Sequence, residues 1–252
     1  MSSLRIVGLV ARKDLAIERR SKVAMHQVVP FAAITMVLFA FALDSSGGDS
    51  GSVIETVAVT DPPRVIRATD VLELVAPGLV WLAVLFSLLI LVQRSFAIEN
   101  DDGALDALRV AGVDPASIFW GKAIALGLQL LALEIILLAI AVVLYRADLP
   151  LAGVGMLAIT LITATGGLSF VGTLYGGLTA GFSGRESLLP LLVLPVVAPV
   201  LIGATRAVES AFGTDGVALS EGWPWIGLLT VFAVAFAVGG ALAFGPLIDE
   251  ST

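Results

Sequence analysis

Two polar side chains stand inside a long apolar stretch, where groups capable of chemistry are rare. Gln129 and Glu134 both fall in the apolar run at residues 118–145. An ionised carboxylate in hydrocarbon costs at least ~2.5 kcal/mol on insertion scales, so Glu134 is expected to meet a partner, face a wet cavity or stay protonated. Two interpretations stay open: a functional role, or structural satisfaction by Gln129 or by a threonine of the next apolar run.

The chain lacks the residues that most enzyme chemistry requires. It has no cysteine and one histidine, which excludes disulfides, thiolate metal sites and cysteine nucleophiles and makes a His-based triad implausible. P-loop, HExxH and GxSxG motifs are absent, and no GxGxxG follows a predicted strand, so the chain cannot hydrolyse ATP alone. We therefore expect no catalytic residue, no metal site and no directly bound cofactor.

The composition predicts an integral membrane protein. Hydrophobic residues make up 58% of the chain and charged residues 14%, and the mean hydropathy is +1.02. A soluble domain could not carry this composition on its surface. The net charge of −7 leaves no basic face for phosphates, so nucleic-acid binding is not expected.

Six apolar runs approach or exceed the ~20 residues that a helix needs to cross ~30 Å of hydrocarbon. They fall at about residues 23–43, 71–92, 118–145, 151–182, 188–204 and 223–247. The expected fold is all-α, a polytopic membrane protein with six transmembrane helices. No repeat or linker divides the chain, so residues 1–252 are expected to form a single membrane domain.

Residues 1–22 predict an amphipathic helix at the membrane interface. Apolar side chains gather on one side, and six positive charges lie largely on the other. A cleaved signal peptide is the competing interpretation, because Ala40 and Ala42 form a small-residue pair after an apolar run; the long charged leader favours the interfacial helix.

The distribution of positive charge predicts the orientation. An inside amino terminus puts ten Lys and Arg in the cytoplasm against four outside, which fits the positive-inside rule and makes both termini cytoplasmic. The inside residues are Arg5, Arg12, Lys13, Arg19, Arg20, Lys22, Arg94, Arg109, Lys122 and Arg185, and the outside residues are Arg64, Arg67, Arg146 and Arg206.

The longest charged interruption, residues 93–122, predicts a short cytoplasmic helix joined to a spanning helix. Asn100, Asp101 and Asp102 offer capping oxygens, apolar residues recur at helical spacing, and Gly112 would end the helix. Asp114 would then cap a second helix that begins at Pro115. Such a rigid joint suits the transmission of a push from a soluble partner; an ordinary solvated loop is the alternative.

The fourth apolar run contains glycines that allow close helix packing, whereas the fifth contains prolines that bend a helix. Gly172 and Gly176 form a GxxxG pair, for which packing within the chain is favoured over a substrate-lining face. Pro190, Pro195 and Pro199 each remove a helical hydrogen bond, so the fifth span should be bent and should face protein or a cavity. A static kink and a moving hinge are equally open.

Three segments, in this order among six spans, resemble the haem exporter protein B family (CcmB): ARKDLAIERRSKVAM, ENDDGALDALRVAGVDPASIFWGK and LLPLLVLPVVAPVLIG. The resemblance implies the permease subunit of an ABC-type complex for cytochrome c maturation in the bacterial inner membrane. It implies a cytosolic ATPase (CcmA), membrane partners (CcmC and CcmD), a haem chaperone (CcmE) and two copies of the chain per complex, with haem as possible cargo.

Under this resemblance, residues 100–113 would be a coupling helix seated in a groove of the ATPase. Leu105 and Leu108 would be its apolar anchors, and Asp101, Asp102 and Arg109 its polar guides. His26 could ligate haem iron, but it has no second candidate ligand nearby, so a polar interface residue is favoured.

Two other functions are compatible with the sequence. One is an ABC exporter permease for a lipid, drug or glycan, which a normal cytochrome c profile in a deletion strain would favour. The other is a non-transporting membrane scaffold, for which ATP hydrolysis by the complex should be insensitive to changes in the proline-rich span, such as Pro195→Ala.

Overall fold

The computed structural model describes residues 3–22, 24–47, 68–101, 110–145, 149–180 and 185–250, and all regular structure in these ranges is helical. The long helices are α1 (Ser3–Ser21), α2 (Val29–Gly47), α3 (Ala68–Asp101), α5 (Pro115–Tyr145), α6 (Leu151–Thr179), α7 (Arg185–Phe212) and α8 (Gly222–Glu250). A π-helical turn, η1 (Ala24–Val28), joins α1 to α2, and two short 3₁₀ turns, η2 (Thr214–Gly216) and η3 (Leu219–Glu221), join α7 to α8.

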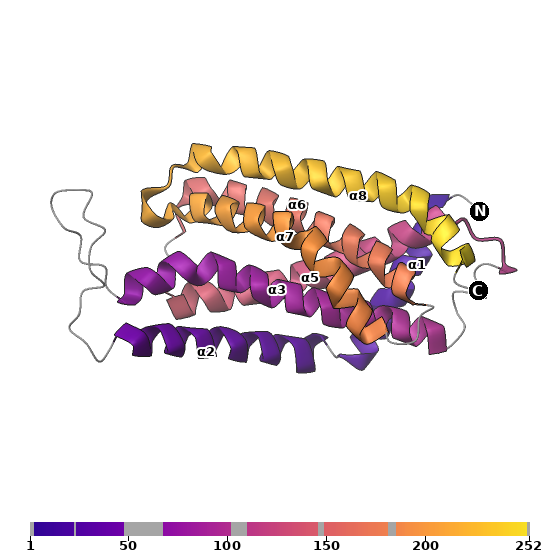
Figure 1. Ribbon diagram of the computed structural model, residues 1–252, viewed down its shortest axis with the longest axis horizontal. Coiled ribbons are helices and arrows are strands. Elements are labelled where there is room, and N and C mark those ends of the chain that lie inside the picture. Colours follow the sequence, from indigo (N-terminus) through magenta and orange to yellow (C-terminus); the bar gives the residue numbers. More distant parts are fainter. Residues whose placement is uncertain are drawn as a thin grey trace.

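The predicted all-helical, polytopic membrane fold is confirmed. Within the described ranges, five helices are long and apolar enough to cross a membrane, and a sixth span results if α1 and residues 26–39, which meet at a bend of 53°, count as one broken span. Figure 1 shows the long helices other than α1 arranged lengthwise in one bundle, with both chain ends at the same end of it. Helices satisfy their own backbone hydrogen bonds, which hydrocarbon requires of any spanning segment.

The helices differ from the predicted runs mainly at their ends. α3 and α7 extend beyond residues 71–92 and 188–204, because hydropathy marks only the apolar part of a helix. At the first span η1 intervenes, and α2 begins only at Val29. Pro30 explains this start, since its ring cannot donate to the preceding turn and is tolerated in the first turn of a helix.

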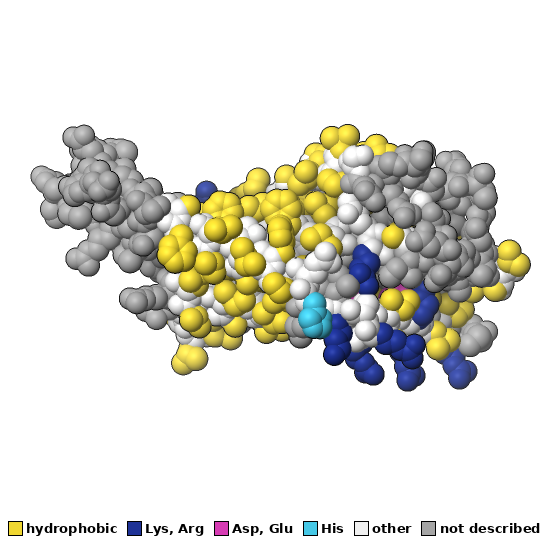
Figure 2. Space-filling view, turned by 90° about the horizontal axis from the view of Figure 1, so that it is seen from below, with side chains coloured by type: hydrophobic (Ala, Val, Ile, Leu, Met, Phe, Trp, Pro, Cys, Tyr) yellow, Lys and Arg dark blue, Asp and Glu magenta, His cyan; other side chains and the backbone are white. Residues whose placement is uncertain are grey.

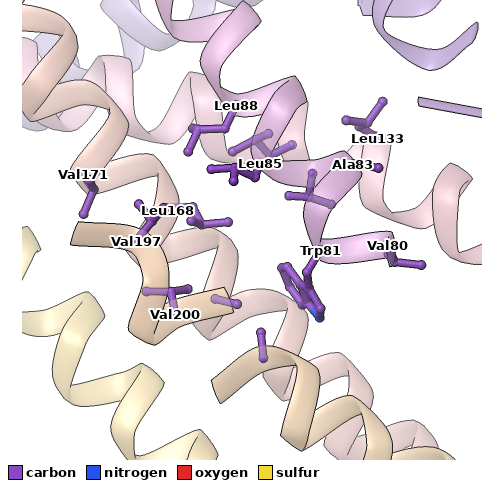
Figure 3. Packing of buried hydrophobic residues seen from close by; sticks show 14 of the residues in the cluster. Val80, Trp81, Ala83, Leu85, Leu88, Leu133, Leu168, Val171, Val197 and Val200 are labelled. Carbon is purple, nitrogen blue, oxygen red and sulfur yellow. The ribbon is translucent and has the colours of Figure 1, made fainter. Parts of the chain in front are cut away.

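α3 is the centre of the bundle and α8 is on its periphery. Of the apolar window of α3, 72% is buried, against 22% for α8. Figure 3 shows Trp81, Leu85 and Leu88 of α3 among Leu168 of α6 and Val197 of α7. Movement of α3 would therefore displace its neighbours on several sides.

The small residues of α6 serve packing inside the chain, as predicted. A Cβ added to Gly176 would lie 2.5 Å from Phe96 and 2.6 Å from Val92 of α3. One added to Gly177 would lie 2.6 Å from Phe244 of α8. Because real Cβ contacts are longer, these glycines let α6 approach both neighbours.

The three prolines lie within one continuous helix, α7, which changes direction along its length in Figure 1. The predicted bend is thus present, whereas the expected buried or cavity-facing position of this span stays a prediction. Pro195 and Pro199 are exposed on the isolated chain, and Pro190 is half-buried. Each proline leaves the carbonyl oxygen four residues earlier without its helical donor, so the exposure of the ring does not determine what that carbonyl meets.

Candidate functional site

A buried lysine joins three helices near the end of the bundle where the chain termini lie. Lys122, on α5, is 2% exposed. Its Nζ lies 3.3 Å from Oδ2 of Asp14 on α1 and 3.2 Å from Oγ of Ser95 on α3, and 4.4 Å from the ring centroid of Phe96. We call these four residues the lysine junction.

α1 reaches the lysine junction because its apolar face packs directly on α5. Val10 and Ala11 are buried, and a Cβ at Gly121 would lie 2.6 Å from that of Val10. At the outer edge, Lys13 lies 3.3 Å from Oδ1 of Asp14. The helix predicted at the interface is therefore fastened to the bundle by one side and keeps its other side exposed.

A second ion pair ties α1 to α3 beside the lysine junction. Arg94 Nε lies 3.8 Å from Oε2 of Glu18, and both side chains are partly buried. A buried pair gives little net stability because desolvation offsets the attraction, whereas loss of one partner leaves an uncompensated charge. The lysine junction is thus better suited to fixing how three helices dock than to adding stability.

The lysine junction stands just inside the predicted coupling segment. α3 ends at Asp101, about two turns beyond Ser95, and α5 begins at Pro115, about two turns before Lys122. The start of α5 is as predicted, because Oδ2 of Asp114 accepts hydrogen bonds from Ser117 N (3.1 Å) and Ser117 Oγ (2.9 Å).

The coupling segment itself is only partly described. Gly112 has a φ of +68°, as expected of a glycine that ends a helix. Asn100 and Asp101 are the last two residues of α3, so the prediction that they cap the start of a separate helix is wrong. The remaining predicted contacts with the ATPase, Asp102, Leu105, Leu108 and Arg109, lie outside the described residues. Their role stays a prediction.

Sequence reasoning missed the lysine junction. One signal was present: Asp14 follows Val7, Val10 and Ala11 at three- and four-residue steps, on the face of α1 that is otherwise apolar. Lys122 is likewise a charge inside an apolar run, and a charged residue in such a place is seldom unpaired.

Glu134 is fully buried and is held by one of the two predicted partners. Its Oε2 accepts a 2.6 Å hydrogen bond from Thr165 Oγ1 of α6. Its Oε1 has no hydrogen-bond partner among the described residues, and the side chain borders a cavity of about 30 Å³ beside Pro77 and Trp81, room for about two waters. Gln129 instead borders a separate cavity with Glu18.

We expect Thr165→Val to destabilise the chain by about 1–3 kcal/mol, because it leaves the carboxyl group without its donor. In a Glu134→Leu background the same change should cost less than about 0.5 kcal/mol, since Thr165 Oγ1 can donate to its own helix there. Thermal unfolding of the four proteins in detergent measures this double-mutant cycle. Equal costs in both backgrounds would show that the hydrogen bond contributes nothing.

The geometry can be set against known proteins. The family model described as "CcmB protein" matches residues 5–246. The chain belongs to the CcmB family. The match includes the basic leader, the hinge and the proline-rich span, so the resemblance seen in the sequence is confirmed. It also includes all four residues of the lysine junction.

Individual members of the CcmB family are similar over most of their length. "Heme exporter protein B" of Rhodobacter capsulatus is 32% identical over 168 residues, 66% of this chain and 74% of that protein. The protein of the same name from Pseudomonas aeruginosa is 29% identical over 72% and 81% of the two chains. That of Paracoccus denitrificans is 32% identical over 68% and 78%.

Proposed function

We propose that an ATPase moves this chain through residues 100–113, and that the lysine junction carries the movement into the bundle. As a CcmB protein, the chain is the permease component of the haem export system of cytochrome c maturation. It is a transporter subunit of an ABC-type complex and not itself an enzyme, so the energy must come from the ATPase partner.

The surface charge supports a cytoplasmic position for the lysine junction and for both termini. Figure 2 shows Lys and Arg side chains gathered at one end of the molecule beside a broad hydrophobic surface. Arg5, Arg12, Arg19, Arg20 and Lys22 of this end are all exposed. Positive charge is retained on the cytoplasmic side of membrane proteins, so we place this end in the cytoplasm of the bacterial inner membrane.

The observation that carries the proposal is the contact of Lys122 with two other helices. A push on residues 100–113 reaches α5 through the capped start at Pro115. Because Lys122 binds Asp14 of α1 and Ser95 of α3, a shift of α5 would pull on both helices. Pro195 and Pro199 offer α7 a place to bend in response.

The partners of the complex follow from the same proposal. We expect a CcmA-like ATPase on the coupling segment, CcmC-like and CcmD-like proteins in the membrane, a CcmE-like haem chaperone outside, and two copies of this chain. α8 supports lateral contacts with lipid or protein, since Val231, Val238 and Leu242 are more than half exposed. Haem is treated as cargo and not as a resident cofactor.

Leu105→Asp combined with Leu108→Asp should abolish co-purification of the ATPase while membrane insertion continues, because two apolar anchors become charged. Affinity purification of the tagged chain from membranes measures this. Val110→Asp is the matched control: Val110 is 90% exposed and lies off the predicted Leu105/Leu108 face, so the ATPase should be retained. Undiminished co-purification with the double variant would refute the assignment of the coupling segment.

A further inference from the structure

A long groove lies between α1, η1, the start of α2 and the middle of α5. Its volume is about 670 Å³, and it is separate from the Glu134 cavity. Basic side chains line its α1 side and apolar side chains its α5 side. The basic group is Arg19, Lys22 and His26, and the apolar group includes Leu128, Ala132 and Ile136.

We propose that this groove binds one anionic phospholipid, with the headgroup phosphate at Arg19 and Lys22 and an acyl chain along α5. The positive charges of the groove lie at the depth of lipid headgroups. Lys22 and His26 directly precede α2, whose Phe31, Ile34 and Leu38 are exposed apolar residues. The basic end of the groove therefore stands where the hydrocarbon begins, at the level of lipid headgroups.

The charge of the groove rim is complementary to an anionic headgroup. Among the residues that the structure describes, no carboxylate lies within ion-pair distance of Arg19 or Lys22. Glu18 also lines the groove, but its carboxylate faces Arg94 at 3.8 Å. The imidazole of His26 is held 2.8 Å from the carbonyl oxygen of Lys22 through Nδ1, which fixes the ring at the rim. An anionic headgroup would pair with these basic side chains at the rim, whereas a zwitterionic headgroup carries its own positive charge and would be attracted less strongly.

The apolar side of the groove has the shape that an acyl chain requires. Leu128, Ala132 and Ile136 follow each other at four-residue steps, so they form a strip about 12 Å long on one side of α5. Figure 2 shows the single histidine between the basic side chains and the hydrophobic surface of the bundle. The groove thus has the polarity of a phospholipid, charged at one end and apolar along its length.

A lipid in this position would bridge the break between α1 and α2. It would contact α1 on the side of Arg19 and α5 at Leu128, and so it would restrain two of the three helices that Lys122 joins. Binding requires only the groove, so this inference can hold even if the coupling segment has another role.

The experiment uses the absence of cysteine, which allows a single label. Ala132→Cys in the full chain carries a bimane fluorophore, and the protein is placed in bilayers of phosphatidylglycerol and phosphatidylcholine, one of them brominated. We expect brominated phosphatidylglycerol to quench the label with an apparent preference on the order of tenfold over brominated phosphatidylcholine. Arg19→Glu with Lys22→Glu should reduce that preference to about one.

Two controls distinguish a specific lipid site in the groove from nonspecific attraction of anionic lipid to the positive charge of the protein. Arg5→Glu with Arg12→Glu makes the same change of charge on the same helix outside the groove, and it should keep the preference. A label at Leu242→Cys on α8, at a residue that is 75% exposed, should be quenched alike by both lipids. Equal quenching at Ala132→Cys, absence of quenching because a protein segment fills the groove, or loss of preference in the Arg5/Arg12 variant would each overturn the proposal.

Discussion

Lys122→Ala is expected to release α1 from α5 without preventing membrane insertion. The substitution removes the cation that Asp14 and Ser95 both contact, and Asp14, which is 8% exposed, keeps only the more exposed Lys13 as an ion-pair partner among the described residues. Removing one member of a buried ion pair costs about 3–5 kcal/mol. This cost falls on the docked position of α1, so the helix should open locally before the rest of the bundle unfolds.

The opening can be measured with a single cysteine at Ala11, a buried residue on the face of α1 that packs on α5. In an Ala11→Cys background, Lys122→Ala should raise the rate of maleimide labelling by about 100-fold or more, the population ratio that corresponds to about 3 kcal/mol. If the lysine junction transmits force, Lys122→Ala should also lower the rate of ATP hydrolysis that the permease stimulates in the reconstituted complex.

Two further variants decide what the lysine junction contributes. Lys13→Ala removes the other cation near Asp14, but Lys13 is 39% exposed, and such pairs are worth about 0–1 kcal/mol, so labelling should change less than about fivefold. Asp14→Leu with Lys122→Met replaces the pair by apolar side chains and should restore docking. A labelling rate in Lys122→Ala equal to that of the parent would show that α1 does not depend on the buried pair.

The restored double variant also separates docking from signalling. If an apolar contact transmits the movement as well as the ion pair does, ATPase stimulation returns together with the docked helix. If stimulation stays low while Ala11→Cys is again protected, the charge pair itself sets the register of α1 on α5. Either result tests the role of Lys122 independently of the contact made by Leu105 and Leu108.

The fold was predictable because hydrocarbon allows few structures. A spanning segment must satisfy its own backbone, so an apolar run of sufficient length is a helix whatever its neighbours do. Glycine spacing in α6 and the Asp114–Pro115 helix start are local signals of the same kind, and both appear in the structure. Even the partner of Glu134 was within reach, since Thr165 belongs to the run that follows it.

The long-range pairing was not predictable. Asp14 and Lys122 are 108 residues apart, and no periodicity connects them; only the docking of α1 on α5 brings them together. The groove with Arg19 and Lys22 arises from that same docking. The sequence pattern predicted that these basic residues lie on the polar side of the helix of residues 1–22, but it gave no information about which residues face them across the groove. The exposure of Pro195 shows a related limit, since a missing N–H says that a helix bends but not toward which side.

A close backbone approach between α6 and α7 predicts a second large effect, at the end of the bundle opposite the lysine junction. Gly153, in the first turn of α6, packs on Ala211 in the last turn of α7. A Cβ at position 153 would fall on the carbonyl oxygen of Ala211 and would lie 2.8 Å from its carbonyl carbon. Backbone atoms cannot rotate away as a side-chain tip can, so even alanine must push the two helices apart.

Gly153→Ala should therefore lower the stability of the chain in detergent by about 1–3 kcal/mol or more, although alanine favours helix by about 1 kcal/mol at an ordinary position. Gly155→Ala is the matched control, because a Cβ at Gly155 meets nothing within 4 Å and should leave the melting temperature equal or higher. Since the length of α5 separates Gly153 from residues 100–113, ATPase co-purification should persist below the melting temperature. A Gly153→Ala protein as stable as Gly155→Ala would mean that α6 and α7 are not locked at this end. In that case the end of α7 near Ala211 would be free to move relative to α6 when the helix bends at Pro195 and Pro199.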